Sequence, residues 1–67
     1  MIEFTILENG KDYEVYENGQ YTFKLGELQE DAGQYWLTTT EPEVGLNIED
    51  MVVIYRKMKE LNEGLNG

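Results

Sequence analysis

Residues 2–25 have the sequence IEFTILENGKDYEVYENGQYTFKL, in which apolar residues alternate with polar ones around two copies of Glu-Asn-Gly. Asn-Gly between alternating segments is the strongest short-range signal for a β-hairpin. The pattern therefore predicts three antiparallel strands, at about residues 2–8, 11–17 and 20–25.

The strand register at the first Asn-Gly follows from the requirement that one face of the sheet is apolar. A two-residue turn at Asn9-Gly10 places Ile6 opposite Tyr13 and Phe4 opposite Val15. Apolar residues then pair with apolar residues, as a buried face requires. We expect a two-residue turn at this position.

The second Asn-Gly needs a different turn, because a two-residue turn there mixes apolar and polar faces. A three-residue loop at 17–19, with its glycine in the left-handed conformation, restores the match. Val15 then faces Tyr21, and Tyr13 faces Phe23. The expected turn is type I with a β-bulge.

The rest of the chain adds one strand and one helix. Residues 26–33, rich in glycine and acidic residues, are predicted to form a loop. Residues 34–40 are aromatic and β-branched and predict a fourth strand, although either of its faces can be the buried one. Asn47 is a good N-cap for a helix at about 48–63. Apolar residues recur at helical spacing along one broad face of it: Ile48, Met51, Val52, Ile54, Tyr55, Met58 and Leu61.

These elements predict one α+β domain over residues 1–67, a β-meander of three to four strands with a C-terminal amphipathic helix packed on the sheet (ββββα). The apolar side chains of the first three strands face the helix. The opposite face is solvated and includes carboxylates. Its side chains are Glu3, Thr5, Leu7, Asp12, Glu14, Tyr16, Gln20, Thr22 and Lys24.

Charge is the clearest indication of function. The net charge of the 67 residues is −9. Residues 1–50 contain twelve acidic and two basic side chains, whereas residues 51–67 contain two acidic and three basic ones. Such a field repels nucleic acid and membrane surfaces and attracts basic proteins. The alternative interpretation is that the acidity only maintains solubility.

The residue types that are missing argue against an enzyme. The sequence has no histidine, cysteine or serine, which are the usual general base and nucleophiles. No phosphate loop or zinc spacing is present, and the acidic group Glu27, Glu30 and Asp31 lacks the ligand alternation of a calcium loop. We expect no enzymatic activity, no cofactor and no metal. Without cysteines or an N-terminal leader pattern, a cytoplasmic location is expected.

Two hypotheses for function remain. In the first, the protein is a non-enzymatic regulator or inhibitor that presents carboxylates to a basic protein surface, in its sharpest form as a DNA mimic. Its size and charge resemble those of phage-encoded inhibitors, and no motif supports the likeness. In the second, it is an accessory or structural module that binds through a sheet edge, exposed aromatics or the helix. Homodimerisation through the helix is a further expectation.

The predicted contact residues combine carboxylates with two aromatic anchors. Tyr and Trp are enriched at protein interfaces, whereas nucleic-acid stacking platforms also require basic residues, which this region lacks. The residues are Glu3, Asp12, Glu14, Tyr16, Glu27, Glu30, Asp31, Trp36, Glu41 and Glu43.

Overall fold

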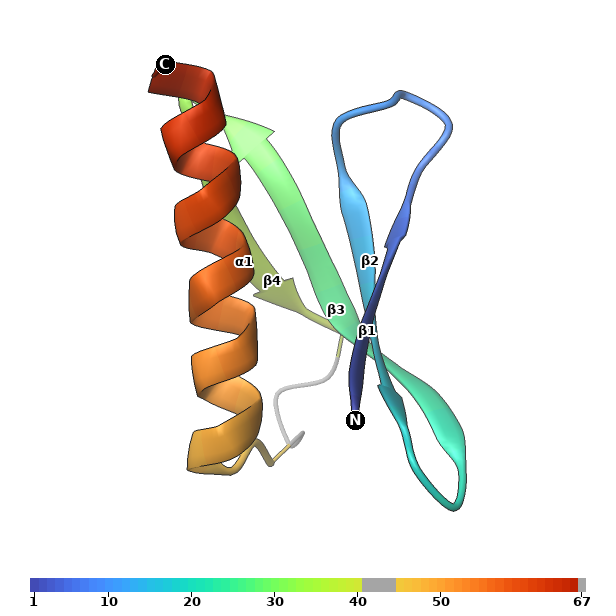
Figure 1. The fold of residues 1–67 in the computed structure, drawn as a ribbon. Coiled ribbons are helices and arrows are strands. Elements are labelled where there is room, and N and C mark those ends of the chain that lie inside the picture. The colour runs from blue at the N-terminus through green and yellow to red at the C-terminus, as the bar shows by residue number, and fades with distance from the viewer. Residues whose placement is uncertain (41–44, 67) are drawn as a thin grey trace.

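Four antiparallel strands in sequential order are followed by one helix (Figure 1). The computed structural model describes residues 1–40 and 45–66. The elements are β1 (Ile2–Ile6), β2 (Tyr13–Asn18), β3 (Thr22–Asp31), β4 (Gln34–Thr39) and α1 (Ile48–Asn66). The predicted α+β meander with a C-terminal helix is confirmed. β4 ends at Thr39, one residue before the predicted end of the fourth strand at Thr40.

The register between β1 and β2 is the predicted one. Ile6 pairs with Tyr13 and Phe4 pairs with Val15. Val15 is completely buried. The apolar alternation of these two strands therefore determines their pairing, because a slip by one residue would turn every apolar side chain to solvent.

The turn that joins β1 and β2 is broader than predicted. The Leu7 N–H donates to the carbonyl of Asp12 at 2.8 Å, and the Gly10 N–H donates to the carbonyl of Leu7 at 3.0 Å. Asn9 Oδ1 accepts the backbone N–H groups of Lys11 and Asp12, each at 3.0 Å. This side-chain oxygen takes the place of ladder bonds, so the strands end at residue 6 and resume at residue 13 rather than at 8 and 11.

The predicted register between β2 and β3 is wrong. Asn18 pairs with Thr22, and the three-residue loop is 19–21 instead of 17–19. Gly19 does not have a positive φ. A β-bulge makes the difference, since Leu25 is an extra residue on β3 opposite the Val15–Tyr16 step.

The bulge changes which side chains of β3 are buried. Leu25 and Leu28 are 2% and 0% exposed, whereas Tyr21 and Phe23, which were predicted to face the core, are 75% and 48% exposed. Leucines thus fill the space that the predicted register gave to aromatic rings. The bulge lets β3 continue across the sheet at a changed angle.

The predicted loop at 26–33 is instead the second half of β3 and a tight hairpin. β3 runs to Asp31, which pairs with Gln34. The two residues between them, Ala32 and Gly33, have φ of 55° and 80°. Positive φ at both central positions is what a type I′ hairpin turn requires, and this turn places β4 next to β3.

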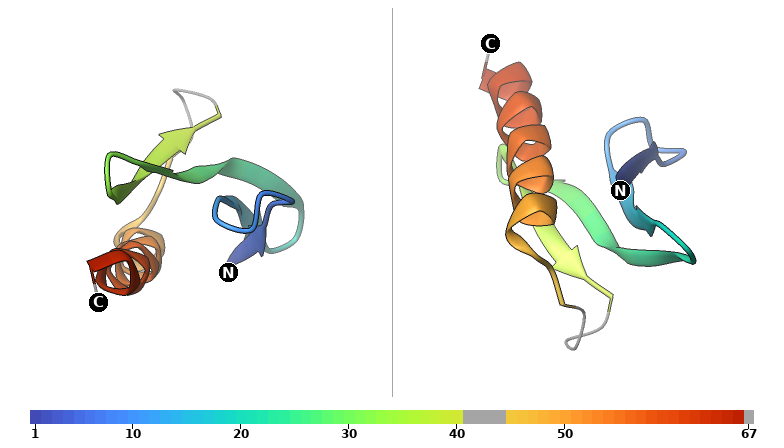
Figure 2. Two further views of the ribbon diagram at one scale, coloured as in Figure 1. Left: turned by 90° about the horizontal axis from the view of Figure 1, so that it is seen from above. Right: turned by 60° about the horizontal axis from the view of Figure 1, so that its bottom comes forward.

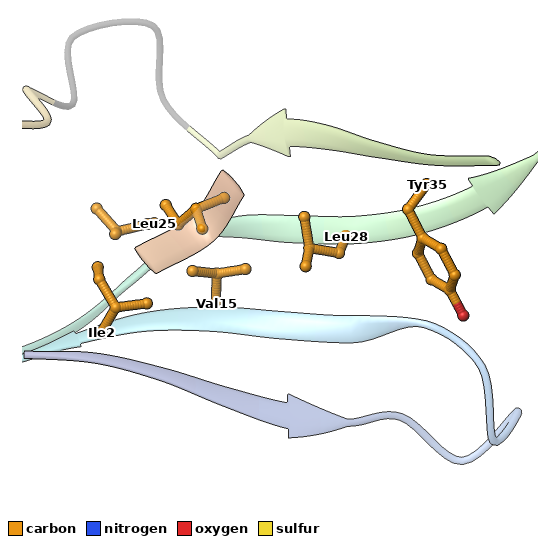
Figure 3. Close-up of a cluster of buried hydrophobic side chains, with 6 residues drawn as sticks. Ile2, Val15, Leu25, Leu28 and Tyr35 are labelled. Atoms are coloured by element: carbon orange, nitrogen blue, oxygen red, sulfur yellow. The ribbon is translucent and has the colours of Figure 1, made fainter. Parts of the chain in front are cut away.

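The core lies between the sheet and the helix, as the buried side chains in Figure 3 show. Its buried members are Ile2, Val15, Leu25, Leu28, Tyr35 and Ile54. Tyr35 is 6% exposed, and its neighbour Trp36 is 50% exposed. The inner face of β4 is therefore the one with Tyr35 and Leu37, which answers the question that the sequence left open.

Helix α1 begins where the sequence predicts and ends later. The side chain of Asn47 accepts the N–H of Asp50 at 2.8 Å, as an N-cap does. The helix continues to Asn66, past the predicted end at residue 63, so Gly64 lies within it. α1 contacts β4 and β1 on one face of the sheet (Figure 2).

One side-chain bond joins the helix to the backbone of β4. The Tyr35 N–H donates to Asn62 Oδ1 at 2.7 Å. The Tyr35 hydroxyl donates to the carbonyl of Lys11 at 2.6 Å, on the far side of the core. Tyr35 therefore connects the helix, β4 and the β1–β2 turn.

Candidate functional site

The face of the sheet opposite α1 is covered by none of the described elements (Figure 2). We call it the outer face. Strand pairing and alternation assign its side chains, which come from all four strands: Glu3, Thr5, Glu14, Tyr16, Asn18, Thr22, Lys24, Glu27, Gln29, Asp31, Gln34, Trp36 and Thr38. Six of the predicted contact residues are in this group, namely Glu3, Glu14, Tyr16, Glu27, Asp31 and Trp36.

Lys24 organises the centre of the outer face. Its Nζ lies 3.0 Å from Glu14 Oε2 and 2.8 Å from Glu27 Oε2. The hydrogen bonds to Glu27 and Glu14 raise the pKa of the Lys24 ammonium, and the bond from Lys24 lowers the pKa of Glu27. Lys24 therefore holds the two carboxylates in fixed orientations, and its positive charge partly offsets theirs.

Glu3 and Glu14 each accept a hydrogen bond from an uncharged side chain. Glu3 Oε1 accepts the side-chain amide of Asn18 at 2.9 Å, and Glu3 is exposed. Glu14 Oε2 also accepts the Tyr16 hydroxyl at 3.3 Å. Since an ionised carboxylate offers about four acceptor positions, these groups keep sites for donors from outside.

Trp36 is the large exposed aromatic residue of the outer face. Its Nε1–H donates to the carbonyl of Asp31 at 3.1 Å, which fixes the orientation of the ring. A ring that is already oriented loses little conformational freedom when it binds. Tyr16, the other predicted aromatic anchor, is half-buried.

A groove beside Trp36 was not foreseen from the sequence. It has a volume of 620 Å³ and lies between β4 and α1. Its lining is mainly aromatic and amide side chains: Gln34, Tyr35, Trp36, Tyr55, Met58, Lys59, Asn62 and Glu63. The signal for this groove in the sequence was the broad apolar face of the helix, which has more apolar surface than one small sheet covers.

Two other predicted contact residues, Asp12 and Glu30, bond to neighbouring parts of the fold. Asp12 Oδ1 accepts the Glu30 N–H at 3.0 Å, and Asp12 Oδ2 accepts the Asn9 amide at 2.8 Å. These two bonds, the backbone one first, lower the pKa of Asp12. Asp12 therefore connects the first turn to β3. Asp31 is exposed at the β3–β4 turn.

Glu27 and Glu30 project from opposite faces of β3, so they cannot share a cation. Glu30 lies 4.0 Å from Lys11. Within residues 1–40 and 45–66, no group of three acidic side chains is placed to hold a metal ion. Glu41 and Glu43 lie outside the described residues.

Comparison with protein-family models, with curated proteins and with solved structures finds no match. In the part of the chain that the structure describes, no helix has the length and apolar character needed to cross a membrane. We therefore infer function from the geometry and charge of the surfaces described above.

Proposed function

We propose that this protein is a non-catalytic protein-binding regulator whose outer face contacts a basic surface on its partner. One observation carries the proposal: Glu3, Glu14, Tyr16, Glu27 and Trp36, which come from four different strands, share one face that no described element covers. These residues combine negative charge with aromatic surface, which is the combination that a basic protein partner would contact.

The chemistry of the face suits arginine and lysine donors. Glu14 and Glu27 are oriented by their ion pairs with Lys24, so little ordering is needed when a partner binds. Charge-assisted hydrogen bonds to carboxylates are among the stronger ones in proteins. Trp36 adds an aromatic anchor beside them. The net charge of −9 accelerates encounter with a basic partner.

The finer form of the proposal is that the partner is a nucleic-acid-binding protein and that the carboxylates take the place of phosphates. Eight of the fourteen acidic residues lie in residues 1–40, which contain all four strands of the sheet. A protein of this kind acts as an inhibitor, because it occupies a groove that nucleic acid would fill. Its binding weakens steeply as salt rises.

The alternative function is an accessory module that binds through apolar surface. The groove between Trp36 and Tyr55 favours it. In that case Trp36→Ala abolishes partner binding while neutral outer-face variants retain it. The converse result supports the acidic surface.

The test is affinity capture of partners from the native host at low and high salt, with matched charge variants. The triple variant Glu3→Gln, Glu14→Gln, Glu27→Gln removes three charges from the outer face. The control variant Glu8→Gln, Glu60→Gln, Glu63→Gln removes three exposed charges elsewhere. We expect only the first to lose the partner at low salt.

A further variant tests whether the partner surface is positively charged. Lys24→Gln removes the single ammonium on the outer face and should strengthen binding to a basic partner. Equal losses in the two triple variants, or binding that does not change with salt, would contradict the proposal.

A further inference from the structure

Helix α1 carries an exposed apolar stripe that its own sheet does not cover. Ile48, Met51, Val52 and Tyr55 recur at the spacing of one helical face. They are 74%, 48%, 38% and 61% exposed, whereas Ile54, which points to the sheet, is 3% exposed. We call these four residues the helix stripe.

The helix stripe is large for such a small protein. From these exposed fractions, it presents roughly 300 Å² of apolar surface per copy, which is the size of the largest patch on a typical monomer. Beside it lies a hollow of 180 Å³. The hollow is lined by apolar and aromatic side chains only: Leu37, Leu46, Met51, Ile54, Tyr55 and Met58.

Charge indicates which molecule covers the stripe. A basic partner is attracted to residues 1–40, which have eight acidic and two basic side chains. Helix α1 has four acidic and three basic side chains, so its net charge is only −1. The helix is therefore the side on which like-charge repulsion between two copies of this acidic protein is weakest.

We propose that the protein forms a homodimer in which the helix stripes of two copies pack antiparallel about Val52. Glu49 and Arg56 are exposed and seven residues apart, so they lie on the same edge of the stripe. In an antiparallel pair, residues on the same edge meet. Glu49 of each copy then lies beside Arg56 of the other, which gives two symmetric ion pairs.

A parallel pair is disfavoured by the same residues. It brings together the two acidic first turns, each with Glu49 and Asp50, and aligns the two helix dipoles. The antiparallel contact uses none of Glu3, Glu14 and Glu27, so the dimer presents two copies of the acidic part of the outer face. Two linked binding faces give higher avidity than one.

The helix stripe has a matched control on the same helix. Val52 belongs to the stripe and is 38% exposed, and Val53 lies on the opposite flank and is 41% exposed. Val52→Glu and Val53→Glu therefore make the same chemical change at equal exposure, and neither removes a buried side chain.

The experiment is sedimentation equilibrium of the full chain from about 5 to about 500 µM, a range that covers micromolar dimers. We expect the wild-type mass to rise from 7.8 kDa toward twice that value. Val53→Glu should behave like the wild type, and Val52→Glu should weaken the dimer at least about tenfold. A wild-type protein that stays monomeric, or equal effects of the two variants, overturns the proposal.

A charge exchange tests the antiparallel arrangement separately. Glu49→Arg and Arg56→Glu should each weaken the dimer, and the double variant should restore it. Absence of rescue would contradict the proposed geometry. The outer-face triple variant should retain the dimer, so failure of dimerisation and failure of partner binding are distinguishable.

Discussion

Replacing Gly26 with alanine tests the close approach of the β3 and β4 backbones most directly. Gly26 follows the bulge residue Leu25 and pairs with Thr39. A Cβ at this position would overlap the carbonyl oxygen of Thr38 and lie 2.9 Å from the Cα of Thr39. These are backbone atoms, so no side-chain rotation relieves the overlap.

The size of the effect follows from the movement that alanine forces. β4 must move by roughly 1 Å to reach a normal contact distance. Overpacking of this kind costs about 1–3 kcal/mol. The movement also weakens the bond from the Thr40 N–H to the Leu25 carbonyl, now 2.9 Å, and a backbone hydrogen bond contributes about 1 kcal/mol. We expect a total loss of about 3 kcal/mol, close to the whole stability of a domain this small.

The assay is thermal unfolding followed by circular dichroism. For a domain of this size, 3 kcal/mol lowers the melting temperature by about 12–24 °C. Gly64→Ala is the control, because Gly64 is inside α1 with open space around it. It should raise stability by about 1 kcal/mol. A melting temperature of Gly26→Ala within about 4 °C of the wild type would refute the close approach of the two backbones at Gly26.

Other regions give predictions of either sign. Ala32→Asn should stabilise the β3–β4 hairpin by about 1 kcal/mol in urea unfolding, because Ala32 has φ of 55° and asparagine tolerates this region better. A destabilised variant would contradict the type I′ turn. Asn47→Ala should cost about 1 kcal/mol by the same method, since the N–H of Asp50 loses its cap. Asp12→Asn should make the free energy of unfolding less dependent on pH. The folded-state pKa of Asp12 is lowered, so its contribution is present above the unfolded pKa and is lost as pH falls through the folded one. Unfolding curves of the two proteins should converge once the pH is below the folded-state pKa of Asp12, and a constant difference between them at every pH would exclude the role of the Asp12 carboxylate.

Alternation in the sequence was sufficient to predict the β1–β2 pairing and the start of the helix. Phe4 and Val15 pair because only one register buries both strands on the same side. Asn47 marks the helix start because its side chain replaces a missing backbone acceptor. Both signals are local, which is why they could be interpreted without the fold.

The second half of the sheet could not be predicted in the same way. Two Asn-Gly pairs suggested the tight turns, but the two-residue turn is at Ala32-Gly33, where alanine takes a conformation that it rarely adopts. The bulge at Leu25 is not part of any alternation. The available signal was Gly26, since an isolated glycine within a strand often marks a bulge or a close backbone crossing.

The sequence predicted which residues belong to the candidate site, but it did not predict the contacts between them. Alternation placed Glu3, Glu14 and Tyr16 together, because these strands were in the correct register. Glu27 was assigned to a loop, so its bond with Lys24 across three residues could not be foreseen. The structural use of Asp12 depends on β3 reaching Glu30, which the sequence did not indicate.

The bond between Tyr35 and Asn62 has a consequence for aggregation. Asp31 and Gln34 close the tight turn, so Glu30 and Tyr35 form the next, non-hydrogen-bonded pair, and the Tyr35 N–H points to the open edge of the sheet. Asn62 covers this donor as a neighbouring strand would. When the C-terminal end of α1 frays, the donor is uncovered and the edge can pair with a strand of another chain. Conditions that loosen the end of the helix would therefore make the protein more prone to aggregate.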